Sequence, residues 1–399
     1  MNDHMTRALA AGALFLALGA TAHAGRVRHV YRTAPTLVGL PTVAFDERYQ
    51  NAADVVLEQA IRNLPLYPGA SSAYTWRWNA ERGALERVDD MVSPWFVTER
   101  GQTLGEGLLN VGLTFGYYRV RDADGEPLGL DPVPLSVGGA PIKYRALTDL
   151  RYTASTFNIT YGVRDDLDVN IAIPIVTLDM DLDVSGRLQQ CCHARSASTQ
   201  TEAANLSDIL VRAKYRFFEG GWEGGPAAAA VGVRARLPTG DPSRGLGTGY
   251  GEIGPFLALS TGFIDGWLDS HLDLGVDAGI GDLRRSSAHY GWALDLHAPR
   301  GQEWWTRLAL TFEILGRSEF AALRERTSVS GPHVTSAGVA DLPYLGFPPQ
   351  RRDYADAVLG VRINLVESIV LSTGVFRALN ASGVRPSDWS PVVSVEGTF

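Results

Sequence analysis

Residues 157–173 read FNITYGVRDDLDVNIAI, and this stretch decides the fold class. Apolar residues occupy alternate positions on both sides of Arg164-Asp165-Asp166, with small or polar residues between them. Successive side chains of a β-strand point to opposite faces, so each half predicts a strand with one apolar and one polar face. The polar centre predicts a tight turn. A strand between lipid and water shows this alternation.

The same alternation recurs along most of the chain, and after residue 24 no apolar run approaches the roughly twenty residues of a membrane helix. We therefore predict an all-β protein, a transmembrane antiparallel β-barrel of about twelve strands, an even number as in bacterial barrels. The predicted strands lie near residues 109–120, 157–163, 167–173, 208–218, 227–237, 251–262, 268–280, 288–298, 304–317, 354–365, 369–380 and 389–399.

The connections between these strands alternate in length. Short links surround Asp165, Gly221, Asp265, Gly301 and Glu367, whereas residues 122–146, 186–205, 239–249 and 319–352 form mostly longer, polar links. Barrels have short turns at the periplasmic end and longer loops outside. A soluble periplasmic β-sandwich would also alternate along its strands, but it would not explain this asymmetry.

Both ends of the chain support secretion to the outer membrane. Arg7, the apolar run 8–20 and Ala22-His23-Ala24 predict a cleaved signal peptide at residues 1–24. The alternating last strand ends at Phe399 and resembles the insertion signal read by the barrel assembly machinery. Outer-membrane lipid and that machinery are therefore expected partners.

Aromatic residues fall near the predicted strand ends, as in the girdles of outer-membrane barrels. The periplasmic girdle is predicted to contain Tyr161, Phe217, Trp267, Trp304 and Phe399, and the outer one Tyr117, Tyr290, Trp292, Tyr354 and Trp389.

Residues 25–105 differ in composition from the barrel predicted at 106–399. A short helix is expected within 53–62 and a hairpin within 74–88. This segment is too short to fold alone, so we expect it to dock as a plug at the barrel mouth or in the lumen.

Charge and cysteine content exclude several classes. A net charge of −8 gives no support for nucleic-acid binding. Cys191 and Cys192 are the only cysteines, are adjacent and lack metal-site spacing, so a disulfide framework is excluded and their role stays open. No cofactor is predicted.

Charged residues at the alternate strand positions that face the lumen form two predicted walls. The basic wall comprises Arg212, Lys214, Arg216, Arg234 and Arg236, and the acidic wall comprises Glu252, Asp273, Asp277 and Asp295. Such walls steer charged or dipolar solutes, or they pair with each other or with a plug. Arg212 and Arg234 should lie almost opposite each other and need negative charge nearby. Carboxylates in and just after the predicted hairpin match this wall, namely Glu81, Glu86, Asp89 and Asp90, and solute or small ions are the alternative source of that charge.

Two neighbouring strands carry a histidine and an aspartate each, His271 with Asp273 and Asp295 with His297. A hairpin centred on Arg284 would set the two histidines opposite each other and the two aspartates likewise. This cluster could bind a divalent metal, although a salt-bridge network is the favoured interpretation.

Four stretches resemble the outer-membrane barrel family of transporters of the meta-pathway of phenol degradation. They are SPWFVTERGQTLG at 93–105, YGVRDDL at 161–167, LPTGDP at 237–242 and GLGTG at 245–249. The resemblance covers the chain from about residue 63 onward and carries no catalytic motif. It implies uptake of aromatic or other hydrophobic compounds.

The sequence thus favours an outer-membrane channel or transporter for small solutes, hydrophobic or aromatic ones included. A structural or adhesion barrel without transport is the alternative. An outer-membrane lipid hydrolase is less favoured, because it needs serine and histidine on the lipid face. His271, His289 and His297 all lie at strand positions predicted to face the lumen. We therefore expect no enzyme activity.

Overall fold

The computed structural model describes residues 56–66, 76–79, 84–87, 97–137, 140–188, 194–222, 225–263, 267–297, 308–321, 329–335, 338–345, 351–366 and 369–399. The predicted signal peptide and both cysteines lie outside these residues. Among the described residues, no helix has the length and apolar character that a membrane crossing requires.

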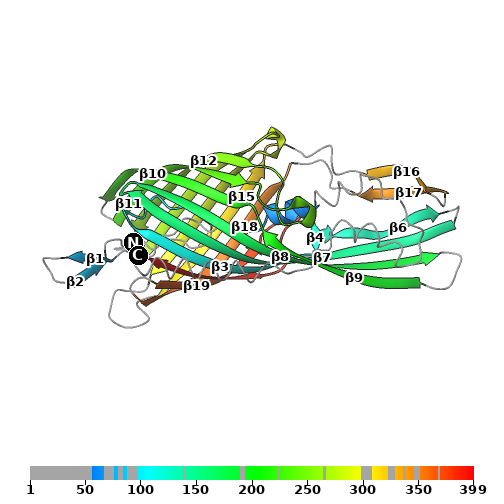
Figure 1. The fold of residues 1–399 in the computed structure, drawn as a ribbon, viewed down its shortest axis with the longest axis horizontal. Coiled ribbons are helices and arrows are strands. Elements are labelled where there is room, and N and C mark those ends of the chain that lie inside the picture. The colour runs from blue at the N-terminus through cyan, green and yellow to red at the C-terminus, as the bar shows by residue number, and fades with distance from the viewer. Residues whose placement is uncertain are drawn as a thin grey trace.

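Twelve antiparallel strands form a closed barrel (Figure 1), as predicted. They are β3 (Leu109–Val120), β7 (Ala140–Arg164), β8 (Leu167–Leu188), β10 (Ile209–Trp222), β11 (Gly225–Leu237), β12 (Glu252–Phe263), β13 (Leu268–Gly279), β14 (Ser287–His297), β15 (Leu308–Glu319), β18 (Asp353–Val366), β19 (Ile369–Ala378) and β20 (Ser390–Thr398). The last strand closes on the first, with Val395 opposite Leu113. Phe399 and Leu109 exchange two backbone hydrogen bonds of 2.8 and 2.9 Å at this seam.

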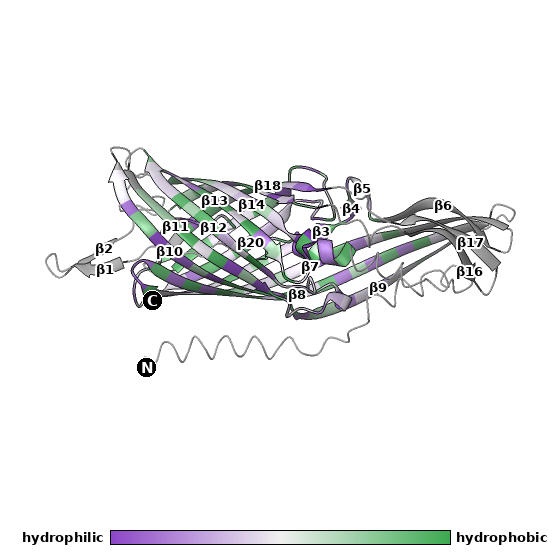
Figure 2. Ribbon diagram, turned by 90° about the horizontal axis from the view of Figure 1, so that it is seen from above, coloured by the Kyte–Doolittle hydropathy of each residue, from purple (hydrophilic) through white to green (hydrophobic). Residues whose placement is uncertain are grey.

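Apolar residues alternate with hydrophilic ones along the strands (Figure 2), and predicted lipid-facing side chains such as Phe115 and Tyr117 are exposed. Eight of the predicted girdle aromatics are exposed, namely Tyr161, Phe217, Trp267, Phe399, Tyr117, Tyr290, Trp292 and Trp389. Trp304 lies outside the described residues. The prediction was wrong for Tyr354, which is only 3% exposed and faces inward against arginine side chains.

Two strands continue far beyond the barrel, since β7 has 25 residues and β8 has 22. A membrane crossing uses only about 9–11 residues. Their distal parts pair with β6 (Gly129–Val137) and β9 (Ala194–Leu206) in a sheet that projects from the barrel end with the longer connections, here called the outer end after the predicted topology (Figure 1). Residues 122–146 and 186–205, predicted as loops, therefore contain much β-structure. Their strands β6 and β9 pair with the long strands β7 and β8.

The remaining elements are small and lie mostly in connections. They are β1 (Trp76–Asn79), β2 (Ala84–Arg87), β4 (Asp122–Ala123), β5 (Glu126–Pro127), β16 (Val329–Thr335), β17 (Gly338–Leu345) and the 3-10 turns η1 (Pro242–Arg244) and η3 (Leu283–Arg285). The predicted loop 319–352 thus contains the β16–β17 hairpin.

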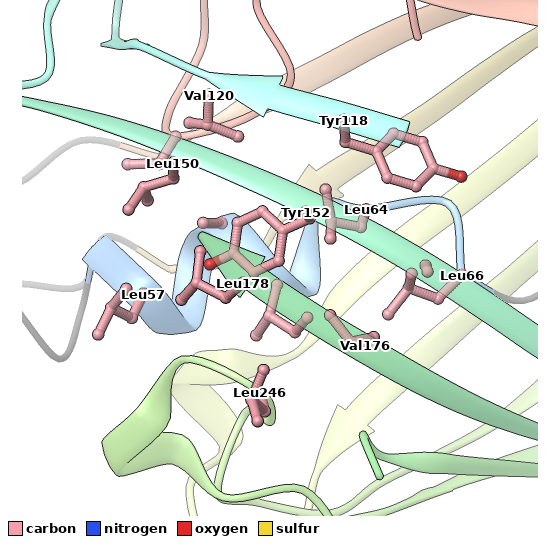
Figure 3. Close-up of a cluster of buried hydrophobic side chains, with 14 of the residues drawn as sticks. Leu57, Leu64, Leu66, Tyr118, Val120, Leu150, Tyr152, Val176, Leu178 and Leu246 are labelled. Carbon is pink, nitrogen blue, oxygen red and sulfur yellow. The ribbon is translucent and has the colours of Figure 1, made fainter. Parts of the chain in front are cut away.

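A short helix at residues 56–62 lies inside the outer end of the barrel (Figure 1). Leu57, Leu64 and Leu66 of this segment are buried in one cluster with wall and loop side chains (Figure 3). The wall and loop side chains in contact include Tyr118, Val120, Leu150, Tyr152, Val176, Leu178 and Leu246. We call residues 56–66 the plug helix segment. The described part of the predicted helix is therefore helical, and its apolar face is buried at the outer mouth.

Candidate functional site

Ion pairs hold the plug helix segment in the outer mouth. Arg62 is 6% exposed, and its Nη2 donates to Glu252 Oε1 and to the carbonyl of Arg285, at 2.7 Å each. Its Nη1 lies 3.6 Å from Glu319 Oε1. Glu58 pairs with Arg285 from the preceding turn of the helix. Polar contacts thus connect the helix to three separate parts of the wall and its loops.

An outer loop covers the same helix. Asp208 accepts hydrogen bonds from the amides of Gly240 and Thr248, at 3.1 and 2.8 Å, and so ties both ends of the loop together. The loop places Leu246 in the buried cluster with Leu57. Gly245 has a φ of +70°, and a Cβ there would lie 3.0 Å from Leu57 Cδ2. The motifs at 237–242 and 245–249 therefore build a cover over the plug; Asp208 was not predicted, because it precedes a strand without any motif of its own.

Glu99 neutralises the basic wall from inside the lumen. It is 3% exposed, forms an ion pair with Arg212 and places Oε2 3.5 Å from Lys214 Nζ. Arg212 lies directly opposite Arg234, as predicted. The predicted neutralising hairpin does form by backbone pairing of β1 with β2, but none of its carboxylate side chains is within the described part of the chain. Glu99 lies in the motif at 93–105, but no role was predicted for it.

Residues 97–105, here called the lumen segment, have further anchors to the wall. The amide and hydroxyl of Thr98 donate to Glu313 Oε2 at 3.2 and 3.0 Å. The amide of Gly101 donates to Ser260 Oγ at 2.8 Å. At the periplasmic turn, a Cβ on Gly162 would lie 1.7 Å from the carbonyl oxygen of Gly105. The motifs at 93–105 and 161–167 therefore fit the lumen segment closely against the barrel.

The other predicted basic residues also form ion pairs, with Arg234 of β11 reaching β13, Arg236 of β11 reaching β12 and Arg216 pairing within β10. Arg234 Nε donates to Asp277 Oδ1 at 2.8 Å, and Arg236 Nε lies 2.9 Å from Glu252 Oε2. Arg216 instead pairs with Glu219, a 63% exposed residue near the end of β10, at 2.8 Å. The geometry is one of local pairing between the two walls and the plug rather than of two open, opposed walls.

The predicted pairing of the histidine and aspartate residues was wrong in register. His271 lies opposite Ala293 and Asp273 opposite Gly291, because the hairpin turns about Asp282 instead of Arg284. Asp282 stabilises that turn by accepting a hydrogen bond from the Arg284 amide at 3.2 Å. The slip is an even number of residues, so all of these side chains still face inward.

The histidines consequently form separate pairs on the wall. His297 Nε2 lies 2.8 Å from Asp269, His271 Nε2 lies 3.4 Å from Asp295, and His289 Nδ1 lies 3.1 Å from Asp277. Within the described ranges, no group of three or more His, Cys, Asp or Glu side chains is arranged to hold a metal ion. The arrangement is that of separate histidine–aspartate pairs along the wall, of which the pairs of His297 and His289 are hydrogen-bonded.

A cavity of about 1120 Å³ of empty space, part of it open to solvent, lies between the plug helix segment and the wall. Its lining combines many arginines and carboxylates with apolar side chains. The charged members are Arg62, Arg212, Arg234, Arg236, Arg317, Arg385, Glu252, Asp273, Asp277 and Asp356, and the apolar ones include Leu64, Leu66, Val97, Leu210, Leu315 and Phe376. This lining suits a ligand with both polar and apolar parts.

Comparison with known families gives one match, to the model described as "Putative MetA-pathway of phenol degradation", over residues 134–334, half of the chain. The chain belongs to this family. No curated protein matches it. The family resemblance inferred from the motifs is thereby confirmed.

Several solved outer-membrane barrels are similar to this family member in architecture. The COG4313 outer membrane channel of Pseudomonas putida F1 has 11% identity and a TM-score of 0.44, with 75% of this chain and 98% of that chain covered. The toluene transporter TbuX of Ralstonia pickettii has 9% identity and a TM-score of 0.30, with 74% and 90% covered. A FadL homologue of Pseudomonas aeruginosa has 10% identity and a TM-score of 0.30, with the same coverage.

Proposed function

We propose that this outer-membrane protein is a channel for small hydrophobic or aromatic solutes, and that its plug helix segment and lumen segment close it between passages. The observation that carries the proposal is the cavity between plug and wall, which combines apolar and charged side chains. A solute enters this cavity only if the plug or its covering loop moves.

The contacts of the plug support such movement. Arg62 and Glu99 bind the wall through side-chain ion pairs and hydrogen bonds, whereas the barrel strands bind each other through a continuous backbone ladder. Hydration can replace side-chain contacts of this kind without breaking the ladder. The barrel therefore has a physical basis for remaining folded while its plug moves.

The direct test is the entry of a radiolabelled aromatic hydrocarbon into intact cells with and without the protein. Expression should accelerate the entry of toluene. It should not change the entry of a disaccharide supplied at a comparable concentration. Equal rates of toluene entry in both strains would refute the proposal. If the protein is instead a structural or adhesion barrel, the strains will differ in surface attachment but not in uptake.

One observation favours an enzyme. Ser260 Oγ lies 2.7 Å from His271 Nδ1, and His271 Nε2 lies 3.4 Å from Asp295 Oδ2, an order of residue types found in serine hydrolases. Ser260 is 4% exposed, however, and its hydroxyl oxygen already accepts the Gly101 amide. We propose that the series Ser260, His271 and Asp295 anchors the lumen segment and catalyses no reaction. A fluorophosphonate probe should not label Ser260; labelling that the S260A variant loses would favour the hydrolase.

A further inference from the structure

The turn that follows the plug helix is bound to Arg317 by neutral oxygens. Arg317 Nη2 donates to the side-chain oxygen of Asn63, and its Nη1 lies 3.5 Å from the carbonyl oxygen of Arg62. Among the described residues, the nearest carboxylate oxygen is Glu319 Oε1, at 3.9 Å, and that atom also lies 3.6 Å from Arg62. Arg317 Nε is buried and has no hydrogen-bond partner among the described residues. Neutral oxygens of the plug therefore make the shortest polar contacts of this guanidinium within the described part of the chain.

Aromatic and aliphatic side chains lie near Arg317 in the cavity lining. Its guanidinium stacks 4.3 Å from the ring centre of Tyr354 on the neighbouring strand. Leu315, two positions earlier on the same face of β15, and Phe376 on β19 line the same cavity. Asp356, the carboxylate on the intervening strand, already forms an ion pair with Arg385. A cation beside an apolar wall is a site for a molecule with one anionic group and one ring.

A carboxylate would bind this guanidinium better than the plug does. Arg–carboxylate hydrogen bonds are charge-assisted and roughly twice as strong as bonds to neutral acceptors, and the planar fork matches a carboxylate with two parallel bonds. Asn63 and the Arg62 carbonyl offer only neutral oxygens. The cavity that Arg317 lines is partly open to solvent, so a solute can reach this guanidinium beside Leu315 and Phe376.

We propose that the cavity binds small amphipathic carboxylates such as aromatic acids, and that the bound carboxylate replaces Asn63 and the Arg62 carbonyl on Arg317 and thereby releases the plug helix segment. The ring then packs on Leu315 and Phe376, which belong to the wall and stay in place. This inference rests on the proposed channel function and adds a substrate class and a gating step to it. A solute that binds only the released state shifts the population toward that state.

The test uses the purified full-length protein in detergent and in planar bilayers, with benzoate as the probe. Benzamide has the same ring without a charge, and acetate has the charge without a ring. Benzoate should bind and raise the open probability, whereas benzamide and acetate at equal concentration should do so at least roughly tenfold less. Equal effects of benzoate and benzamide would overturn the proposal.

Two variants locate the effect. R317Q should weaken benzoate binding by roughly tenfold or more. N63D places a carboxylate of the plug itself on Arg317, although it loses the hydrogen bond from Asn63 Nδ2 to the Val384 carbonyl at 2.6 Å, so it should lower the affinity for benzoate. R164Q, which changes an exposed arginine of a periplasmic turn, is the matched control and should behave as the unmodified protein. Unchanged benzoate binding in R317Q, or in N63D if R317Q does not fold, would overturn the proposal.

The outcomes separate this inference from the channel function. If toluene enters cells through the protein but benzoate neither binds nor opens it, the carboxylate gate is wrong and the channel proposal stands. If no aromatic solute enters through the protein, the channel proposal fails whatever benzoate does in vitro.

Discussion

The carboxylate of Glu99 binds the guanidinium of Arg212 inside the barrel, although 113 positions separate the two residues in the chain. Removing one partner of a buried ion pair leaves the other charge uncompensated, at a cost of about 3–5 kcal/mol. Glu99 also faces Lys214, so it balances two cations of one wall. This relationship makes the lumen segment part of the electrostatics of the pore.

Replacement of Glu99 by Gln should therefore loosen the lumen segment and destabilise the plugged state by roughly 3 kcal/mol. The freed cations should also shift ion selectivity toward anions, and high salt should weaken the shift by screening. Thermal denaturation and reversal potentials measure both effects. E106Q, an exposed change in the turn next to the lumen segment, is the control; identical selectivity in E99Q and E106Q would show that Glu99 does not face the conduction path.

The close approach of Gly162 to Gly105 predicts a steric effect. A Cβ at position 162 would lie 1.7 Å from the Gly105 carbonyl oxygen, so G162A must displace the backbone. We expect a loss of about 1–3 kcal/mol in unfolding free energy, as for other overpacked sites. G112A is the matched control on the neighbouring strand, because its Cβ would meet Glu396 Cβ at an ordinary 3.4 Å. Equal stability of the two variants would contradict the described fit of the lumen segment.

Topology follows from the position of the turns. In a C191S/C192S background, L283C in the outer η3 turn should react with a membrane-impermeant maleimide on intact cells, because Leu283 is 75% exposed. E219C near the opposite end of the barrel should react only after the outer membrane is permeabilised. Reaction of E219C on sealed cells would reverse the topology.

Asp124 links the β4–β5 turn to other outer-end segments. Its Oδ1 accepts the Gly383 amide at 2.6 Å, and its Oδ2 lies 2.8 Å from Arg352 Nη2. Burial raises the pKa of Asp124, but the bonds to Arg352 and Gly383 lower it more, so the pKa lies below its ordinary 3.8.

Because the folded-state pKa is depressed, this clamp should be complete above about pH 4 and be lost as the pH falls through the folded-state pKa. Hydrogen exchange of the Gly383 amide, corrected for its intrinsic rate, should therefore accelerate at low pH. D124N should show fast exchange at all pH values. Slow exchange in D124N would mean that the carboxylate does not protect the amide.

Much of the barrel could be predicted from sequence, because a lipid face and a water face impose a strict two-residue period. Residues 109–120 were placed to the residue. The projecting sheet was not predicted, because the apolar positions of β8 change from odd ones such as Ile173 to the even ones Leu178, Met180 and Leu182, which are buried, so the lipid-facing period ends within the strand.

The site was harder to predict than the fold. The two-residue alternation correctly predicted that Arg212 and His271 face inward, because a register shift by an even number of residues does not change the face of a side chain. The partners of these side chains depend on the strand register and on the path of the plug. The hairpin was therefore centred on Arg284 instead of Asp282, and no role was predicted for Glu99. A negative residue within a motif that precedes the first strand was the available signal for Glu99.

The central claim is that the N-terminal segment closes the lumen through Arg62 and Glu99. It is tested most directly by planar-bilayer recordings of the unmodified protein beside the R62A/E99Q double variant. The account predicts a low open probability for the unmodified protein and a markedly higher one for the variant, with both still folded as barrels by circular dichroism. Equal open probability and equal conductance of the two proteins would contradict it.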